Sequence, residues 1–286
     1  MKYYKNYINL IRTRQWYKNF VIFLGIFFVG DLFNIEKILL ILVSFFSLAF
    51  ISSCGYIIND LIDYKKDRLH PEKKKRPIAS GKISKFKAVF LAIFLLISSF
   101  LIAIKVNNLF FLSVLSLFII TTLYTLFLKN IFLVDVLAIA SLFVIRAIAG
   151  AVAIEVTISH WLILIPFFLS LFLSIGKRHT DVILLKEKAS LTREVLKYYN
   201  LDFSNSLMVI TTTMFIISYT FYSFLSGFKS LIFTLPLALY TIFRFFFLIK
   251  CGSIIARNPE KVINDKGIML AIALWCIVTT IIIYTH

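Results

Sequence analysis

Three oxygen-bearing side chains, Asn59, Asp63 and Asp67, recur at four-residue intervals in one short stretch of the chain. On an α-helix this spacing places all three on one face. Carboxylates at this spacing repel each other, and near the C-terminal end of a helix they also oppose its macrodipole. A bound cation removes both penalties, and oxygen ligands suit Mg²⁺ that carries a phosphorylated compound. We therefore predict that these three residues bind Mg²⁺ and that Asp63 and Asp67 are catalytic; a solvated polar helix end is the alternative.

A loop rich in lysine and arginine follows this stretch, and Pro77 and Gly81 near its end are typical of turns. Within the loop, Lys74 and Arg76 are predicted to contact phosphate oxygens of a substrate. An arginine can do so in a bidentate manner, whereas a lysine acts as a point charge. For any single lysine of the loop, the alternative is the ordinary charge bias of membrane proteins.

A second polar cluster, Lys177, Arg178 and Asp181, comes at the end of a later apolar segment. If the helix continues, all three lie within about one turn. The two cations could hold a diphosphate, and Asp181 could hold a metal ion or a substrate hydroxyl. We predict a catalytic role for these three residues. The alternative is a helix end whose basic side chains extend to the membrane surface.

Four further residues are predicted to contact substrate: Lys18, Tyr124, Lys129 and Arg146. Arg146 lies inside an apolar segment, where an ionisable residue is a functional candidate by default. Asp135 shares its helix face but is about 16 Å away at 1.5 Å per residue, which is too far for direct pairing. A buried structural tie to another acid is the alternative role for Arg146. For Lys18, the alternative is anchoring at the membrane interface beside aromatic residues.

Long apolar segments must position these residues. The chain has 286 residues, 60% of them hydrophobic, and a helix needs about 20 apolar residues to cross a bilayer. We predict an all-α membrane protein, a bundle of nine transmembrane helices that form one domain over residues 1–286. The nine segments are 16–33, 38–59, 86–105, 109–128, 132–154, 159–176, 205–226, 229–250 and 267–285.

The basic residues are distributed unequally between the two sides of this predicted bundle. Most of the net charge of +17 falls in the N-terminal arm and in the loops after the second, fourth, sixth and eighth segments. The opposite loops hold only Lys37, Lys105 and Lys229. The positive-inside rule therefore predicts a multi-pass protein of the cell membrane whose N-terminus and active-site loops are cytoplasmic. This charge suits anionic lipids and phosphorylated substrates, and nucleic acid is not an expected partner.

The Asn59-x3-Asp63-x3-Asp67 pattern on the second of nine predicted helices resembles the UbiA-type intramembrane prenyltransferase superfamily. The resemblance extends over nearly the whole chain and is closest to the decaprenyl-phosphate phosphoribosyltransferase branch. It implies a central cavity capped on the cytoplasmic side, with Mg²⁺ as cofactor. The further motifs that carry it are Gln15-Trp16-x-Lys18-Asn19, the turn from Arg76 to Gly81, Arg146-x3-Gly150, Lys177-Arg178, and Asn258-Pro259-Glu260 with Asp265 and Trp275.

The chain departs from the superfamily at one place. Members that transfer a prenyl group usually carry a second Asp-x3-Asp pattern, but here Leu185 stands four residues after Asp181. The nearby Lys177 and Arg178 fit a substrate with an additional anionic group. The resemblance thus implies Mg²⁺-dependent transfer of a 5-phosphoribosyl group from phosphoribosyl diphosphate to a polyprenyl phosphate, with release of diphosphate, in cell envelope biosynthesis.

Two other functions are compatible with the sequence. One is transfer of a prenyl group from a prenyl diphosphate to an aromatic quinone precursor or to a lipid. The missing second Asp-x3-Asp pattern counts against it. The other is transport of a phosphorylated solute, which paired Gly or Pro breaks at the membrane midplane would favour. Pro166 and Pro236 lie deep in apolar segments, but neither has an evident partner in a repeat.

Overall fold

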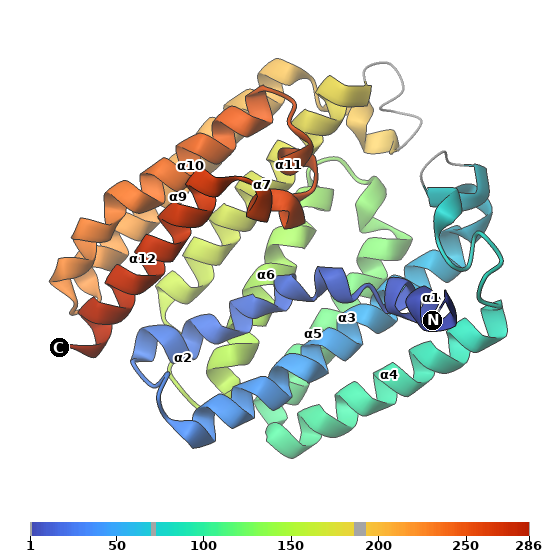
Figure 1. The fold of residues 1–286 in the computed structure, drawn as a ribbon, viewed down its shortest axis with the longest axis horizontal. Coiled ribbons are helices and arrows are strands. Elements are labelled where there is room, and N and C mark those ends of the chain that lie inside the picture. Colours follow the sequence, from blue (N-terminus) through green and yellow to red (C-terminus); the bar gives the residue numbers. More distant parts are fainter. Residues whose placement is uncertain (1, 70–72, 186–192, 286) are drawn as a thin grey trace. The chain divides into compact units, whose positions relative to one another are not determined.

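The chain folds into helices, as the sequence predicts. A computed structural model describes residues 2–69, 73–185 and 193–285, and this part of the chain contains no β-strand (Figure 1). Within these described ranges, eight helices are long and apolar enough to cross a membrane, so the chain is a multi-pass membrane protein. They are α3 (Ile35–Leu69), α4 (Lys85–Val106), α5 (Asn108–Leu126), α6 (Val134–Ala153), α7 (His160–Leu185), α9 (Leu201–Leu225), η6 with α10 (Lys229–Thr234 and Leu235–Lys250) and α12 (Lys266–Tyr284).

The first predicted segment, 16–33, is helical but changes from a 3-10 helix to an α-helix. It consists of the 3-10 helix η1 (Thr13–Phe23) and the short α-helix α2 (Leu24–Val29). Arg12 separates η1 from the preceding α1 (Lys2–Ile11) with a left-handed φ of 53°, and Gly30 ends α2 with a φ of 86°. The prediction of nine membrane helices therefore holds approximately, with eight long spans and one interrupted segment in the described part of the chain.

Two helices extend well beyond their predicted ends. The segment predicted to end at residue 59 continues in α3 to Leu69, and the one predicted to end at residue 176 continues in α7 to Leu185. The apolar runs stop where predicted, but helical hydrogen bonding continues through the polar residues. Both polar clusters therefore lie on the final turns of long helices. Within each cluster, helical geometry fixes the angles between the side chains.

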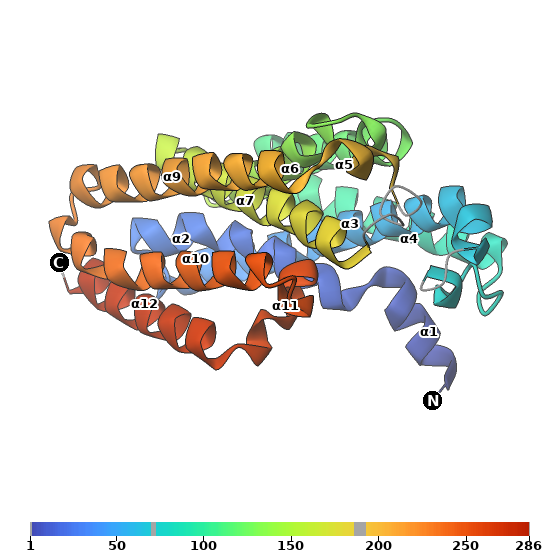
Figure 2. The ribbon, with the colours of Figure 1, turned by 90° about the horizontal axis from the view of Figure 1, so that it is seen from above.

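The chain divides into two compact units. Unit 1 comprises Met1–Ile26, Leu32–Leu128 and Ile145–Thr157, and unit 2 comprises Phe27–Asp31, Lys129–Val144 and Ile158–His286. In unit 1, α3 packs against α4, α5 and η1. In unit 2, α7 packs along α9, and α10 packs along α12, as Figure 2 shows. The single domain over residues 1–286 stays a prediction.

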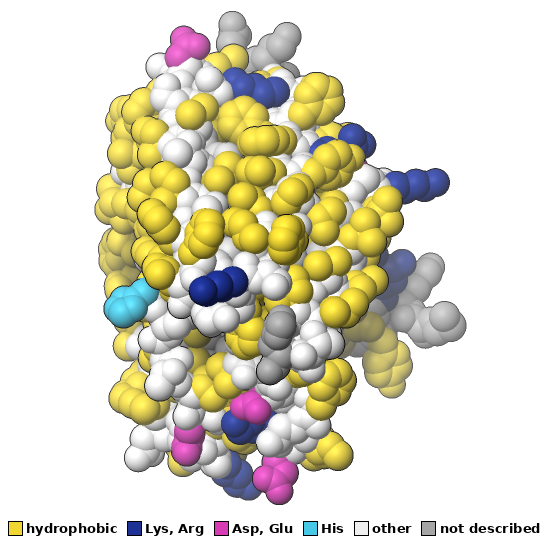
Figure 3. Space-filling view, turned by 90° about the vertical axis from the view of Figure 1, so that its left-hand side faces the viewer, with side chains coloured by type: hydrophobic (Ala, Val, Ile, Leu, Met, Phe, Trp, Pro, Cys, Tyr) yellow, Lys and Arg dark blue, Asp and Glu magenta, His cyan; other side chains and the backbone are white. Residues whose placement is uncertain are grey.

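Each unit has its own apolar core. In unit 1 it includes Leu10, Cys54 and Ile57, and in unit 2 it includes Phe172, Tyr199 and Ile249. Many large apolar side chains nevertheless face outward, and hydrophobic side chains predominate on the face drawn in Figure 3. Such a surface is suited to contact with lipid. Exposed examples from unit 2 are Phe221, Phe224, Phe233, Phe243 and Phe247.

The short elements between the long helices carry several polar residues. They are η2 (Lys73–Lys75), η3 (Leu128–Asn130), η5 (Glu194–Tyr198), α11 (Ile254–Arg257) and η7 (Pro259–Asn264).

Candidate functional site

Four oxygen-bearing side chains share one face of the last turns of α3, and we call Asn59, Asp60, Asp63 and Asp67 the oxygen face. Helical geometry spreads them over an arc of about 100°, with Asp60 about 20° from Asp67. Asn59 and Asp63 are half-buried, whereas Asp60 and Asp67 are only 2% and 3% exposed. The predicted face is thus present, and Asp60 is an additional member of it. A plot of residue angles around the helix would have found it.

Two arginines neutralise the buried carboxylates of the oxygen face. The Nη1 atom of Arg76 lies 3.1 Å from Asp60 Oδ1 and 2.6 Å from Asp67 Oδ2. Arg12 Nη2 lies 2.5 Å from the same Asp60 oxygen, and its guanidinium stands over the ring of Tyr56. Arg76 is predicted as a phosphate ligand, which stays a prediction; in the structure it contacts the two carboxylates. Sequence reasoning missed the pairing with Arg12 altogether.

The loop that carries Arg76 belongs to unit 1 and is anchored in its core. Arg68 Nε donates to the carbonyl oxygen of Ala79, 3.1 Å away. Gly81 closes a turn by donating its N–H to Ile78, and its φ of 75° suits glycine. The side chains of Ile78 and Ile83 are buried in the unit 1 core. The backbone of Arg76 is therefore fixed, while the predicted phosphate ligand Lys74 is exposed to solvent.

The oxygen face fits a divalent cation of the Mg²⁺ type. Its donors are an amide and carboxylates, and the bridging position of the Arg76 guanidinium shows that positive charge is stabilised here. No group of three or more His, Cys, Asp or Glu side chains among the described residues could hold a metal by itself. Mg²⁺ commonly binds through one or two carboxylates and completes its shell with water and substrate phosphates. Asn59, Asp63 and Asp67 are compatible with that mode.

Arg146 is buried in unit 1 and is 6% exposed. Its Nε donates to Asn19 Oδ1 at 2.8 Å, and its Nη2 lies 3.4 Å from Ser52 Oγ. One turn later, Gly150 lets α6 approach the backbone of η1 at Ile22. These contacts tie α6 to η1 and α3 and favour the structural alternative for Arg146.

The other three predicted substrate contacts are Lys18, Tyr124 and Lys129. Lys18 is half-buried on η1, and Tyr124 is half-buried in the last turn of α5. Lys129 is half-buried in η3 and belongs to unit 2. Contact of these residues with substrate stays a prediction.

Asp135 is the centre of a buried polar cluster in unit 2. Arg178 Nε lies 2.9 Å from Asp135 Oδ2, and the Tyr199 hydroxyl donates to Oδ1 at 2.8 Å. Arg193 Nη1 lies 3.5 Å from Oδ2. Burial and the neighbouring carboxylate raise the pKa of Tyr199, so its hydroxyl stays a donor at neutral pH. Arg178, which is 4% exposed, thus has a structural partner that the sequence did not identify.

Asp181 and Arg178 have different partners, although both lie on α7. Arg257 Nε, at the end of α11, lies 2.9 Å from Asp181 Oδ1. Lys177 is half-buried one turn before Asp181. The last turns of α7 therefore carry Lys177 beside two arginine–carboxylate pairs, and binding of a diphosphate by these cations stays a prediction. Sequence reasoning missed Arg257, although it directly precedes the Asn258-Pro259-Glu260 motif.

Two other residues of the recognised motifs have structural contacts in unit 2. Asp265 caps α12 by accepting from the N–H of Ile268 at 3.0 Å, and Arg244 Nε lies 2.7 Å from the same carboxylate oxygen. The Arg244 guanidinium holds the pKa of Asp265 below its usual value. Trp275 Nε1 donates to the Tyr219 hydroxyl at 2.7 Å.

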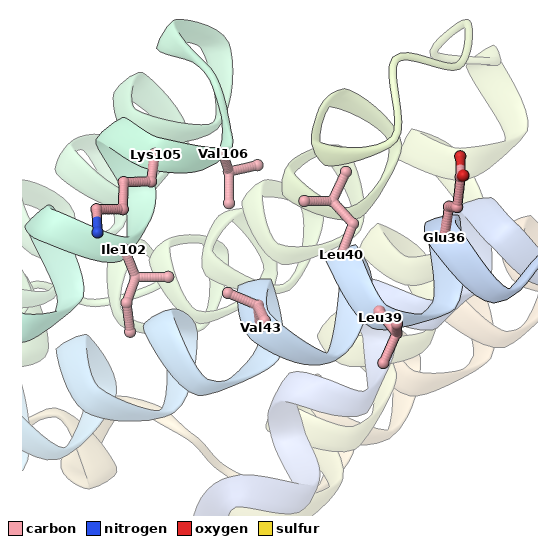
Figure 4. A pocket seen from close by; sticks show the side chains of 7 residues that line it. All are labelled: Glu36, Leu39, Leu40, Val43, Ile102, Lys105 and Val106. Atoms are coloured by element: carbon pink, nitrogen blue, oxygen red, sulfur yellow. The ribbon is translucent and has the colours of Figure 1, made fainter.

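A groove of about 390 Å³ lies in unit 1 between the first turns of α3 and the last turns of α4 (Figure 4). Its lining is mostly apolar, with Glu36 and Lys105 as its charged residues. Glu36 is 23 residues before Asn59 on the same helix, which corresponds to about 35 Å. This groove is therefore not part of the oxygen face.

Comparisons with known proteins agree on one family. The model of the UbiA prenyltransferase family matches residues 19–261. A decaprenyl-phosphate phosphoribosyltransferase of Mycobacterium tuberculosis H37Rv is 27% identical over 274 residues, which are 94% of this chain and 91% of the relative. The enzyme of that name from Mycolicibacterium smegmatis is 32% identical over 225 residues, covering 76% of this chain and 70% of the relative.

Solved structures share the fold. A UbiA homolog from Archaeoglobus fulgidus, bound to DMAPP and Mg²⁺, has a TM-score of 0.75 at 21% identity and covers 98% of this chain and 99% of its own. A structure from work on the biosynthesis of digeranylgeranylglyceryl phosphate synthase in membranes has a TM-score of 0.70 at 20% identity, with full coverage of both chains.

Proposed function

Since this chain belongs to the UbiA prenyltransferase family and is a membrane transferase, we propose that it transfers a 5-phosphoribosyl group from phosphoribosyl diphosphate to a polyprenyl phosphate and releases diphosphate. Relatives at 27% and 32% identity carry the name decaprenyl-phosphate phosphoribosyltransferase. Their names support transfer of a phosphoribosyl group to a polyprenyl phosphate over the other reactions that the family suggests.

The observation that carries the proposal is the set of basic side chains at the C-terminal end of α7. Leu185 stands where a second carboxylate would follow Asp181, and Asp181 itself is paired with Arg257 at 2.9 Å. Lys177 and Arg257 remain partly accessible to an anion. A prenyl diphosphate has one anionic group, whereas phosphoribosyl diphosphate has two. The additional cations support a donor with a second phosphate.

The oxygen face is proposed to receive the diphosphate end of the donor. Asn59, Asp63 and Asp67 would hold Mg²⁺, which when bound neutralises charge on the leaving diphosphate. A solved structure with this fold, that of the Archaeoglobus fulgidus homolog, contains both DMAPP and Mg²⁺. Lys74 and Arg76 would add direct contacts to phosphate oxygens.

In unit 2, Lys177, Arg178 and Asp181 are proposed to act at the donor. Lys177 is accessible enough to contact a phosphate, and Asp181 is proposed to hold a ribose hydroxyl. Because Arg178 is buried against Asp135, its contribution would be to position the end of α7. Lys18, Tyr124 and Lys129 complete the set of proposed substrate-binding residues, while Arg146, predicted as one of them, is proposed to hold Asn19 and Ser52 in place.

The reaction needs no strong general base on the protein. A polyprenyl phosphate oxygen is already ionised at neutral pH and attacks ribose C1 as the diphosphate leaves. His179, a buried histidine of α7, is hydrogen-bonded to Ser204 at 2.7 Å and is therefore occupied structurally. The lipid tail of the acceptor is proposed to lie among the apolar helices.

The assay that tests this function uses purified protein with Mg²⁺, decaprenyl phosphate and labelled phosphoribosyl diphosphate. We expect a new ribosylated lipid and stoichiometric diphosphate, both lost on removal of Mg²⁺ by EDTA. A prenylated product from prenyl diphosphate and an aromatic acid, with none from the ribosyl donor, would identify a prenyltransferase instead. Accumulation of unreacted donor inside proteoliposomes would identify a transporter.

A further inference from the structure

One nitrogen atom of Arg76 bridges two carboxylates of the oxygen face. Its Nη1 atom lies 3.1 Å from Asp60 and 2.6 Å from Asp67. Both acids are almost fully buried, whereas the Arg76 side chain is 25% exposed. A buried carboxylate without a partner is strongly unfavourable, so both acids need positive charge close by.

The two carboxylates differ in the cationic partner that each would keep if the Arg76 side chain moved away. Asp60 has a second cation, since Arg12 Nη2 lies 2.5 Å from its Oδ1 atom. Asp67 has Arg76 as its ion-pair partner within the described ranges. Asp60 therefore stays neutralised without Arg76, but Asp67 requires a replacement cation.

The backbone of Arg76 is held in place while its side chain reaches the surface. The carbonyl of Arg76 accepts from the N–H of Ser80 at 2.9 Å, and the following Pro77, Ile78 and Ala79 are buried. A change of side-chain rotamer can thus move the guanidinium without unfolding the loop.

We propose that Arg76 is an exchangeable counter-cation for Asp67. It holds this carboxylate in the substrate-free protein, leaves it when a divalent cation binds there, and then contacts the diphosphate of the donor. Asp60 and Arg12 form the permanent pair beside it. This inference rests on the proposed function, and it adds a competition between an arginine and a metal for one carboxylate.

The competition has a thermodynamic consequence. A metal that binds alone must displace Arg76 from Asp67 and leave its guanidinium with only Asp60, which Arg12 already neutralises. When diphosphate is also present, the released guanidinium gains a new anion. The two ligands should therefore favour each other's binding, and by linkage this coupling is reciprocal.

The test measures Mn²⁺ binding to the full-length protein in detergent by electron paramagnetic resonance. We compare wild type with Arg76→Met and Arg76→Gln; the glutamine keeps a hydrogen-bond donor for Asp67 without its charge, in case the methionine variant does not fold. Without diphosphate, both variants should bind Mn²⁺ at least about tenfold more tightly than wild type. The matched control is Lys82→Met, which removes one exposed charge from the same loop and should shift the affinity by less than about twofold.

Two further measurements complete the test. The Arg76 variants should unfold at a lower temperature than wild type in EDTA, and Mg²⁺ should raise their unfolding temperature by more than it raises that of wild type. Adding diphosphate should increase the Mn²⁺ affinity of wild type by a larger factor than it increases the Mn²⁺ affinity of the variants. Equal Mn²⁺ affinities in wild type and Arg76→Gln would overturn the exchange. A gain in Mn²⁺ affinity for Lys82→Met as large as that of the Arg76 variants would overturn it as well.

The outcome separates this inference from the proposed function, because Mn²⁺ binding is measured without the ribosyl donor. If the affinities are equal and the ribosylated lipid still forms, the exchange is wrong and the function stands. If the exchange is observed but no ribosylated lipid forms, the function is wrong and the competition for Asp67 stands.

Discussion

Asp63 and Asp67 lie one helical turn apart, yet their surroundings differ. Asp67 is buried against Arg76, whereas Asp63 is half-buried. The spacing of the acids was enough to predict their common face. Their arginine partners were not predictable from spacing, because Arg12 and Arg76 stand 48 and 16 residues from Asp60 along the chain. Local periodicity has no information about which distant segment reaches a helix face.

Replacing Asp63 by Asn tests the metal site with the least disturbance of the fold. The change removes charge from a half-buried position, so we expect the unfolding temperature to stay close to that of wild type. Turnover should fall by about 100-fold or more, because stabilisation of the leaving diphosphate by the metal is weakened. Turnover is measured in the ribosylated-lipid assay, with the exposed Asp202→Asn as a control. Undiminished turnover of Asp63→Asn would refute the assignment.

Replacing Asp135 by Asn tests whether its cluster is structural. Arg178 would keep a hydrogen-bond acceptor but lose the buried negative charge that balances it. We expect a loss of about 3 kcal/mol in unfolding free energy. Tyr199→Phe, which removes one hydrogen bond to the same carboxylate, should cost about 1 kcal/mol. Thermal or denaturant unfolding in detergent measures both, and a larger loss for Tyr199→Phe would contradict the central place of the Asp135 charge.

At the scale of elements, the apolar runs predicted the order of the helices, but they did not predict where the helices end. α3 and α7 continue for about ten residues beyond their predicted ends. Buried ion pairs with Arg76, Asp135 and Arg257 accommodate the polar side chains of those last turns. The change from the 3-10 helix η1 to the α-helix α2 was also missed. Close approach of Gly25 to the backbone of Ala151 is a tertiary contact without a local signal.

Close helix packing at Gly150 can be tested with alanine. A Cβ atom there would collide with the carbonyl group of Ile22, which is backbone and cannot yield easily. At Gly176, the corresponding Cβ would meet the end of the flexible Ile249 side chain. Alanine also favours a helix over glycine by about 1 kcal/mol. We expect Gly150→Ala to lower the unfolding temperature clearly and Gly176→Ala to change it little; equal shifts would contradict this reading of the contacts.

At the scale of the whole molecule, composition predicted a multi-pass membrane protein, and the eight long apolar helices confirm it. The division into two units was not foreseen. The chain passes from unit 2 to unit 1 between Val144 and Ile145, inside α6. No loop or change in composition marks this passage, so linker signals in the sequence could not reveal it.

The proposed orientation can be tested at the two ends of α4. Lys82 precedes this helix and Lys105 is near its C-terminus, and both are exposed. Each is replaced by Cys in a background with Cys251→Ser and Cys276→Ser, since the third cysteine, Cys54, is buried. In spheroplasts, an impermeant maleimide should label the cysteine at 105 and spare the one at 82, with the reverse in inverted vesicles. The opposite pattern would place the basic loops outside the cytoplasm.

The position of Arg76 has a consequence for how this loop evolves. Lys75 and Lys82 are exposed and contribute charge that many substitutions could supply. Arg76 instead satisfies two buried acids at once. Among relatives, residues at positions 75 and 82 should therefore vary, while those at 60, 67 and 76 should be inherited as a set. A lineage that loses the acid at 67 should soon lose the arginine at 76 as well.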